Sequence, residues 1–312
     1  MRYAPQKLNF LKKIPFWFFT SQGNSPRSLG RSSDGRRLFC CCGVTINDYL
    51  KNLFFRNLLH SLFIFHFYLI LVLSVRQSLP TYSRLTQKAD LTRLIQTLMH
   101  VPRFHWILIE DSLQKTALVT KLLQKSGLTF THLNKKNTAL KYTKDLQTRN
   151  TALNWIRDNV NNETDGVLYF MDDDNTYGLK LFQEMRKTKL ASAWPVGLVG
   201  GLKYEGPVLC KNGRVVTWRV VWAPKRTIPI DMAGFAVSTA LVRQFPKVVF
   251  VDKRELESLF LEGLGITRDT IEAQGNNCTE VNVWHTQTVK TKADLEKIAT
   301  EKGTELNPLI EV

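Results

Sequence analysis

The sequence is short of acidic residues and of cysteines. Its 312 residues contain 27 Asp and Glu against 43 Lys and Arg, and 5 cysteines. It has no internal repeat, collagen pattern or low-complexity composition, and a hydrophobic share of 44% with 22% charged residues is typical of a packed core. A fibrous, coiled-coil or largely disordered protein is therefore excluded.

The formal net charge of +16 is unevenly distributed, because the first 77 residues carry 11 basic and 2 acidic side chains. Such a surplus suits an anionic partner, whether nucleic acid, phospholipid or an acidic small molecule, or it is a solvated face with no partner. The basic residues are not interleaved with aromatic ones in the manner of nucleic-acid-binding segments. We therefore expect no nucleic-acid partner.

The cysteines fall into two groups. Cys40, Cys41 and Cys42 are adjacent and match no metal-ligand spacing, so they are either a site of S-acylation near a membrane or an inert cluster. Only Cys210 and Cys278 remain, and two cysteines are too few for a disulfide scaffold. Their redox state stays open, and the rest of the chain must be held together by its own core.

An apolar run near the N-terminus suggests a membrane anchor. Residues 57–75 contain no Asp, Glu, Lys or Arg, and as a helix they are long enough to cross a hydrocarbon core of about 30 Å. The basic, partly disordered segment 1–56 would then be cytosolic, and everything after residue 76 lumenal. Alternatively, the run is a buried helix of a soluble protein. In a lumenal chain the sequons at Asn162 and Asn277 are candidate glycosylation sites.

From residue 79 onward, strand and helix patterns alternate. We expect helices over 83–100, 116–126 and 149–160, and apolar strands over 105–110, 129–133 and 166–171. This alternation is typical of an α/β protein with a parallel sheet covered on both faces, in which ligands bind at the carboxyl ends of strands. After residue 190 the strands become shorter, with a hairpin turn at Asn212-Gly213. We therefore divide this part into 79–190 and a second subdomain, 191–312.

Three consecutive aspartates follow the strand predicted over 166–171. Asp172, Asp173 and Asp174 would repel one another and raise one another's pKa values, and a divalent cation would relieve that repulsion. Hard cations such as Mg²⁺ and Mn²⁺ combine carboxylate oxygens with phosphate oxygens of a substrate. The three residues are therefore either a metal-diphosphate site or an acidic turn that caps the next helix.

Several long motifs occur in one order from residue 79 to the C-terminus. They include Pro80-Thr-Tyr-Ser-Arg84, Glu110-Asp111, Asp172-Asp-Asp-Asn-Thr-Tyr177, Trp194-Pro-Val-Gly-Leu-Val-Gly-Gly201, Asp231-Met-Ala-Gly-Phe-Ala-Val237 and Val283-Trp-His-Thr286. In these motifs the chain resembles the β-1,3-glucuronyltransferases, type II Golgi enzymes that transfer glucuronic acid from UDP-glucuronate to galactose. The resemblance implies a Rossmann-like glycosyltransferase type A fold with a donor-binding half and an acceptor-binding half. It also implies a homodimer, Mn²⁺ as cofactor, an inverting reaction and a galactose-terminated glycan on a protein as acceptor.

The resemblance also assigns roles to individual residues. Glu257 matches the catalytic base and Asp174 the metal ligand. The positions that match donor contacts are Tyr82, Asp111, Lys144, Arg149, Asp172, Asp173, His285 and Gln287, and those that match acceptor contacts are Glu205, Arg226 and Asp231. Trp222 is either a sugar-stacking face beside the acceptor contacts or a core aromatic.

The sequence departs from the family at three places. Gln287 and Lys144 each stand where the family has arginine, which favours, as an alternative, a catalytically weak member that binds nucleotide sugar or glycan. The family also has an apolar strand directly before Pro-Thr-Tyr, whereas here Val75-Arg-Gln-Ser-Leu79 is polar. Either the apolar run 57–75 serves partly as that strand, or the first 77 residues are a divergent N-terminus.

Overall fold

The computed structural model of the chain describes residues 68–76, 85–137, 145–161, 166–289, 293–304, 307 and 310. The chain divides into two units, residues 1–61 and 62–312. The account below concerns the second unit, which contains all of the described residues.

The first part of this unit is a parallel sheet with helical crossovers. Its strands lie in the order β3-β2-β1-β4, and each neighbouring pair is parallel. The elements in chain order are β1 (Tyr68–Arg76), α2 (Gln87–Leu98), β2 (Phe104–Asp111), α3 (Ala117–Ser126), β3 (Phe130–Asn134), α4 (Leu146–Asn159) and β4 (Gly166–Met171). The α/β class and the alternating elements expected from the sequence are confirmed.

Strand β1 corrects the bounds of the predicted membrane span. Its residues pair with β2 on one side, as Leu71 with Trp106, and with β4 on the other, as Leu71 with Tyr169. Residues 68–75 are therefore a strand inside the sheet and not part of a membrane-spanning helix. No helix of the described residues is long and apolar enough to cross a bilayer, and residues 1–67 lie outside the described part. The interpretation that the apolar run serves partly as the first strand is confirmed.

Local signals explain the bounds of α3. The Thr116 side chain accepts a hydrogen bond from the backbone N–H of Val119, which satisfies one free donor of the first turn. The helix ends at Gly127, whose φ of 69° is the left-handed conformation that glycine adopts without a steric penalty. Both ends agree with the helix expected over 116–126.

Glu110, at the end of β2, has a structural role. Its fully buried carboxylate accepts bonds from the backbone N–H and the hydroxyl of Thr116, at 2.9 and 2.7 Å, and its Oε1 lies 2.6 Å from Nε2 of His132 on β3. The side chain thus joins two strands to the start of α3. Ligands bind at the carboxyl ends of parallel strands, where Glu110 lies, but these contacts occupy both of its oxygens.

The second part of the unit extends the same sheet. Strand β10 pairs antiparallel with β4, and the order continues as β10-β6-β11-β9-β8-β7-β12-β5. These strands are β5 (Thr176–Tyr177), β6 (Ala191–Ala193), β7 (Val196–Gly197), β8 (Tyr204–Lys211), β9 (Arg214–Arg219), β10 (Phe235–Ser238), β11 (Glu272–Ala273) and β12 (Val283–Trp284). The helices are α5 (Leu179–Met185), η1 (Met232–Gly234), α6 (Thr239–Gln244), α7 (Leu256–Gly263), α8 (Gly275–Cys278) and α9 (Asp294–Glu301).

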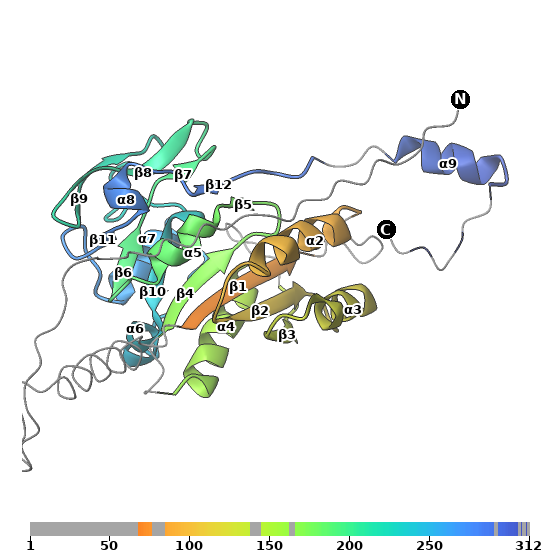
Figure 1. Ribbon diagram of the computed structural model, residues 1–312, viewed down its shortest axis with the longest axis horizontal. Helices are drawn as coiled ribbons and strands as arrows, with labels where there is room; N and C mark the ends of the chain where they lie inside the picture. The colour runs from red at the N-terminus through yellow and green to blue at the C-terminus, as the bar shows by residue number, and fades with distance from the viewer. Residues whose placement is uncertain are drawn as a thin grey trace, which may run out of the picture. The chain divides into compact units, whose positions relative to one another are not determined.

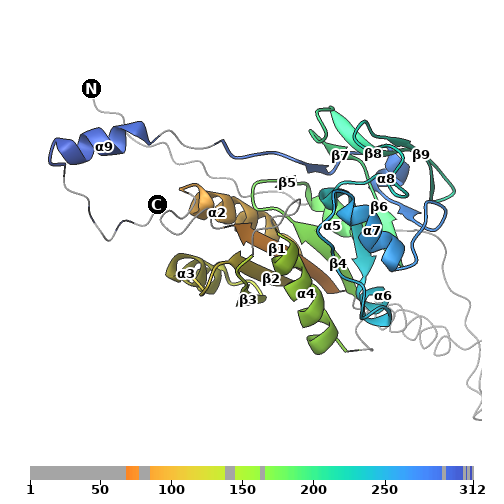
Figure 2. The same ribbon diagram turned by 180° about the vertical axis from the view of Figure 1, so that it is seen from behind.

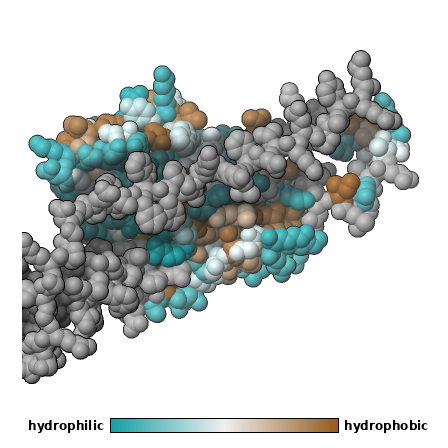
Figure 3. Space-filling view, viewed as in Figure 1, coloured by the Kyte–Doolittle hydropathy of each residue, from teal (hydrophilic) through white to brown (hydrophobic). Residues whose placement is uncertain are grey.

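The hairpin β8–β9 forms where the sequence predicts it. Asn212 and Gly213 have φ angles of 53° and 73°, as a two-residue turn of primed type requires. In Figure 3 this end of the molecule shows apolar surface among hydrophilic residues, and Leu209 and Val216 on the two strands are each more than half exposed.

Helices cover both faces of the sheet. Figure 1 shows α2 and α5 on one face, and Figure 2, from behind, shows α4 and α7 on the other. Alternate residues of β4 enter the two cores: Tyr169 packs in the cluster that includes Leu91 of α2, and Phe170 in the cluster that includes Ile156 of α4. This three-layer packing holds the carboxyl end of β4 in a fixed position.

A disulfide links the two halves of the second part. Cys210 on β8 and Cys278 at the end of α8 are bonded, with Cα atoms 5.9 Å apart and a separation of 68 residues in sequence. The bridge ties the turn 275–280 to the hairpin. The sequence left the redox state of these cysteines open, and the structure answers that question.

We expect Leu71→Ala to lower the free energy of unfolding by about 2–5 kcal/mol, because Leu71 is fully buried between two strands and truncation leaves a cavity. Leu113→Ala is the matched control: this leucine is 86% exposed, and the change should stay within about 0.5 kcal/mol. Denaturant unfolding of the full chain measures both. If the Leu71 variant were as stable as the wild type, the placement of β1 in the core would be contradicted.

Candidate functional site

The candidate site lies where the connections of the sheet change direction. From β1 the chain passes through α2 to β2 and β3, and it returns through α4 to β4 on the other side of β1. The carboxyl ends of β1 and β4 therefore lie side by side at a topological switch point, where open α/β sheets bind ligands. Asp172, Asp173 and Asp174 follow directly after β4.

Tyr177 holds the start of this aspartate turn. Its hydroxyl accepts a bond from the backbone N–H of Asp172 and lies 2.8 Å from the carbonyl oxygen of the same residue, to which it donates. The Tyr177 ring is buried and packs edge-on against Tyr169 of β4. The backbone of Asp172 is thus fixed to the core of the sheet.

A segment from the far end of the chain lies against the same turn. We call residues 285–288, which follow β12, the strap. The hydroxyl of Thr286 donates to the carbonyl oxygen of Asp174 at 2.6 Å, and the backbone N–H of Thr288 lies 3.4 Å from the Asp174 carboxylate. The strap, which carries the predicted donor contacts His285 and Gln287, thus reaches Asp174 through its two threonines, across more than one hundred residues of sequence.

The electrostatics of the turn show an excess of negative charge. Burial raises the pKa of Asp172, and the neighbouring carboxylates of Asp231 and Asp145 raise it further, while Arg149 and His285 act in the opposite direction. Arg149 is itself buried and lies 3.6 Å from Asp145. The cations present therefore leave the ionised form of Asp172 less favourable than in water, and an additional cation would correct this.

The donor set fits a divalent cation shared with a phosphate ligand. The described residues contain no group of three or more His, Cys, Asp or Glu that would form a complete metal cage. A cation that is held by one or two carboxylates and by substrate phosphates needs no such cage. The Asp174 carboxylate, half-buried beside the strap, and the unfavourably charged Asp172 meet that requirement.

Asp231 stands at the junction of two groups of predicted residues. Its carboxylate caps the short helix η1 by accepting from the N–H of Ala233 at 2.9 Å, and it lies 4.0 Å from Nδ1 of His285. Tyr169 and Trp194 both donate to the carbonyl oxygen of Ala233, at 3.0 and 2.9 Å. Two buried aromatic side chains therefore fix the backbone that presents Asp231.

Glu205 and Arg226 form a buried pair beside it. Arg226 Nη2 lies 3.9 Å from Glu205 Oε1, and the guanidinium also donates to the carbonyl oxygens of Ile230 and Ala223. Burial raises the pKa of Glu205, Asp231 adds to that effect, and Arg226 opposes it. Glu205 Oε2 is buried with no hydrogen-bond partner among the described residues, so one acceptor of this pair is left for a ligand.

Trp222 lies over this pair and faces solvent. The Arg226 guanidinium is 4.5 Å from the centre of its ring, and 45% of the Trp222 side chain is exposed. The interpretation of Trp222 as a core aromatic is therefore wrong. An exposed aromatic face held by a buried arginine suits the stacking of a sugar ring.

Glu257 lies in the first turn of α7, and its pKa is raised to about 7. Burial is the main cause, the Asp231 carboxylate adds to it, and Arg149 and Arg226 act against it. A carboxyl group with a pKa near neutrality is suited to accept a proton during a reaction. The Glu257 carboxyl thus lies within the electrostatic influence of Asp231 and Arg226, two of the predicted acceptor contacts.

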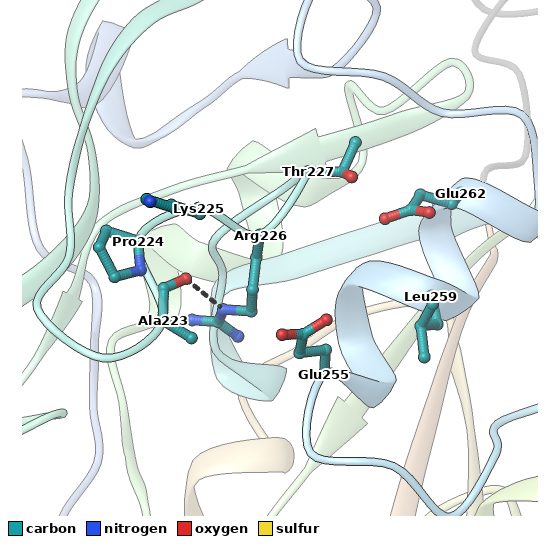
Figure 4. Close-up of a pocket in the computed structure, with 8 residues that line it drawn as sticks. All are labelled: Ala223, Pro224, Lys225, Arg226, Thr227, Glu255, Leu259 and Glu262. Carbon is teal, nitrogen blue, oxygen red and sulfur yellow. Dashed lines mark hydrogen bonds between the residues drawn. The ribbon is translucent and has the colours of Figure 1, made fainter.

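Arg226 also borders a pocket of about 420 Å³, shown in Figure 4. The loop that carries Lys225 and Arg226 forms one wall, and Glu255, directly before α7, and Glu262 of α7 form the other. Asp173 lines a different pocket of about 460 Å³, together with Arg93 of α2 and His100, which follows that helix.

The remaining predicted residues have different outcomes. Asp111 ends β2, where it accepts from the N–H of Asn137 at 2.8 Å and lies 3.4 Å from Lys136. Asn277 is exposed, and its side chain donates to the carbonyl oxygen of Cys210. Tyr82, Lys144 and Asn162 lie outside the described residues, so their roles stay predictions.

The sequence reasoning missed the residues that hold the strap. Thr286 and Thr288 contact Asp174, and Asp90 of α2 accepts from the Thr288 hydroxyl at 2.7 Å. Nothing in the local sequence around these residues indicates the contacts, because they join segments between 112 and 198 residues apart. The one available signal was that Thr286 belongs to the motif Val283-Trp-His-Thr286.

Comparison with known proteins finds one family model and relatives that carry the same enzyme name. Residues 94–289 match the model of glycosyltransferase family 43. Galactosylgalactosylxylosylprotein 3-beta-glucuronosyltransferase 3 of Homo sapiens is 45% identical over 256 residues, which cover 75% of this chain and 76% of that protein. The corresponding enzyme sqv-8 of Caenorhabditis elegans is 45% identical over 232 residues, which cover 70% of this chain and 65% of that protein, slightly less than two thirds. Among solved structures, S. aureus TarS 1–349 has a TM-score of 0.45 and 13% identity over 70% of this chain and 60% of that chain.

We expect Glu257 to make stability depend on pH. Its pKa is about 7 in the folded protein against 4.5 as the ordinary value, so the folded chain binds this proton more tightly than the unfolded chain. The resulting stabilisation is complete below about pH 4.5 and is lost as the pH rises through about 7. Compared with Glu257→Gln, the free energy of unfolding of the wild type should fall across that window.

The matched control is Glu262→Gln, which changes an exposed glutamate on the same helix. Its pH dependence of unfolding should follow the wild type. Parallel curves for the wild type and Glu257→Gln would contradict the shifted pKa.

Proposed function

The chain belongs to glycosyltransferase family 43, and we propose that this member transfers glucuronic acid from UDP-glucuronate to a terminal galactose, forming a β-1,3 linkage with inversion. The relatives reported above are named β-1,3-glucuronosyltransferases that act on a galactosylgalactosylxylosyl protein. We propose the same linker glycan as the acceptor.

One observation carries the assignment of roles. The Asp231 carboxylate raises the pKa values of Asp172, Glu205 and Glu257, and the Arg149 charge lowers those of Asp172 and Glu257. The aspartate turn and the proposed base therefore lie in one electrostatic field. A donor at the turn and an acceptor beside Glu205 and Arg226 would meet in front of Glu257.

The residues suit an inverting displacement. Glu257 takes the proton from the acceptor hydroxyl while that oxygen attacks the anomeric carbon, and the bond from this carbon to the diphosphate oxygen breaks with its electron pair on the leaving UDP. Asp174 and Asp172 would hold a divalent cation, for which we propose Mn²⁺, that would neutralise charge on the diphosphate. His285 and Gln287 on the strap would contact the same leaving group.

The acceptor side suits a neutral sugar. Glu205 and Asp231 supply carboxylate oxygens that accept from sugar hydroxyls, and the buried Arg226 orients Glu205. Trp222 offers an exposed ring for the apolar face of a galactose.

The two bonded cysteines support a proposal about the compartment. A disulfide between Cys210 and Cys278 forms and persists in oxidising surroundings. Asn277, in its Asn-Cys-Thr sequon, is exposed. Both observations support a lumenal location in the secretory pathway, and we propose the Golgi lumen. The homodimer stays a prediction.

A catalytically weak member that binds nucleotide sugar is the second candidate. Gln287 favours it, because the family has arginine at this position of the strap and a neutral amide binds phosphate more weakly than a cation does. Gln287 is exposed next to two threonines that contact Asp174, so the difference falls on the leaving-group side.

We expect the purified full chain to release UDP when given UDP-glucuronate, Mn²⁺ and a galactose-β-1,3-galactose acceptor. Its kcat/KM should rise with pH and level off above about 7, because Glu257 must lose its proton to act as a base. Glu257→Ala should reduce kcat by roughly 10²-fold or more and leave UDP affinity within a few fold. An unaltered pH profile and rate in this variant would remove Glu257 from the mechanism.

Gln287→Arg separates the two candidates. If a restored cation adds ~1.4 kcal/mol of stabilisation to the departing diphosphate, kcat should rise roughly tenfold. Gln124→Arg, which adds the same charge at an exposed position of α3, should leave the rate unchanged. Steady-state rates of the wild type and both variants decide between the two candidate functions. A rate that Gln287→Arg leaves unchanged or lowers would show that the amide is not a defect.

A further inference from the structure

The strap has a second anchor, on α2, away from the aspartate turn. The Thr288 hydroxyl donates to Asp90 Oδ1 at 2.7 Å, and Arg93 Nη2 lies 2.6 Å from the same oxygen and 3.3 Å from the Thr288 hydroxyl. Asp90 is 1% exposed. A buried carboxylate is costly unless it is paired and hydrogen-bonded, so this contact is a built feature of the fold.

The anchor lies where the strap leaves the surface. The next residue, Val289, is 85% exposed. Within the strap, Thr286 bonds the Asp174 carbonyl oxygen and Thr288 bonds Asp90. Because successive side chains of an extended segment point to opposite sides, the two threonines turn inward and Gln287 turns outward.

The same residue reaches Asp174. The Thr288 backbone N–H lies 3.4 Å from Asp174 Oδ2, while its side chain is held by Asp90. Thr288 therefore connects a buried carboxylate on α2 to the proposed metal ligand. Without the side-chain bond, the Thr288 backbone N–H that faces Asp174 would no longer be held in place. The position of the neighbouring Gln287 would also no longer be fixed.

We infer that Asp90, acting through Thr288, is a positioning residue for the cation and diphosphate side of the site. Because Asp90 is buried, we assign it no direct contact with donor or acceptor. It fixes the strap so that the Asp174 carboxylate and the Gln287 side chain keep their places. This inference rests on the proposed function, since it assigns Asp174 to a cation shared with UDP.

The test measures binding in the absence of turnover. UDP affinity of the full chain is determined by calorimetry at a series of Mn²⁺ concentrations. Thr288→Val removes the hydroxyl donor with little change in shape, and we expect it to raise the Mn²⁺ concentration for half-maximal UDP binding by about threefold to tenfold, the effect of one hydrogen bond. Thr288→Ser keeps the donor and should stay within about twofold of the wild type.

Thr92→Val is the matched control. Its hydroxyl donates to the Lys88 carbonyl oxygen on the exposed side of α2, without contact to the strap, and its Mn²⁺ dependence should equal that of the wild type. In steady-state assays Thr288→Val should raise the KM for UDP-glucuronate and leave the KM for the acceptor unchanged. A purely structural role would not raise the KM for UDP-glucuronate while leaving the KM for the acceptor unchanged.

The outcomes separate this inference from the proposed function. A wild-type chain that binds no UDP at any Mn²⁺ concentration overturns the proposed function. If the wild type binds UDP and Thr288→Val shows the same Mn²⁺ dependence, the positioning role alone is overturned. A lower midpoint of thermal unfolding together with wild-type Mn²⁺ dependence has the same consequence, because the bond would then be structural only.

Discussion

The crowding of carboxylates around Asp231 is the constraint on which the site depends. Asp231 raises the pKa values of Asp172, Glu205 and Glu257, so four acidic groups share a partly buried space. Arg149 and Arg226 are the described cations that oppose this repulsion at Glu257. Burial is the largest cause of the raised pKa of Glu257, which is about 7, and of the raised pKa of Asp172, and the Asp231 carboxylate adds to both. The proposed base and the proposed metal site thus share two causes, burial and the charge of Asp231.

The fold places these groups by converging segments on the end of β4. The parallel half supplies the aspartate turn and Arg149. Asp231 lies at the start of η1 and Glu257 in α7, and the strap follows β12. Side chains of the core hold the backbone at each point: Tyr177 at Asp172, and Tyr169 with Trp194 at Ala233. A site assembled in this way depends on tertiary contacts more than on any single motif.

Much of the α/β pattern was predictable because it is local. The period of apolar residues, the threonine cap of α3 and the glycine after it predict helices and strands within a few residues of their observed bounds. The run at 57–75 misled for a physical reason: a strand buried on both faces and a membrane span are both continuous apolar sequences. Pairing with β2 and β4 distinguishes them, and pairing is not local.

The sequence by itself determined which chemistry is present: three aspartates after an apolar strand, a glutamate at the start of a helix, and motifs that are shared with a family of known activity. Only the tertiary structure decided that Glu257 has a raised pKa, that Trp222 faces solvent, that Cys210 and Cys278 are bonded, and that Asp90 reaches Asp174 through Thr288. Each of these depends on burial or on a contact between segments far apart in the chain. Such properties arise when the segments pack against one another, so no local pattern of residues encodes them.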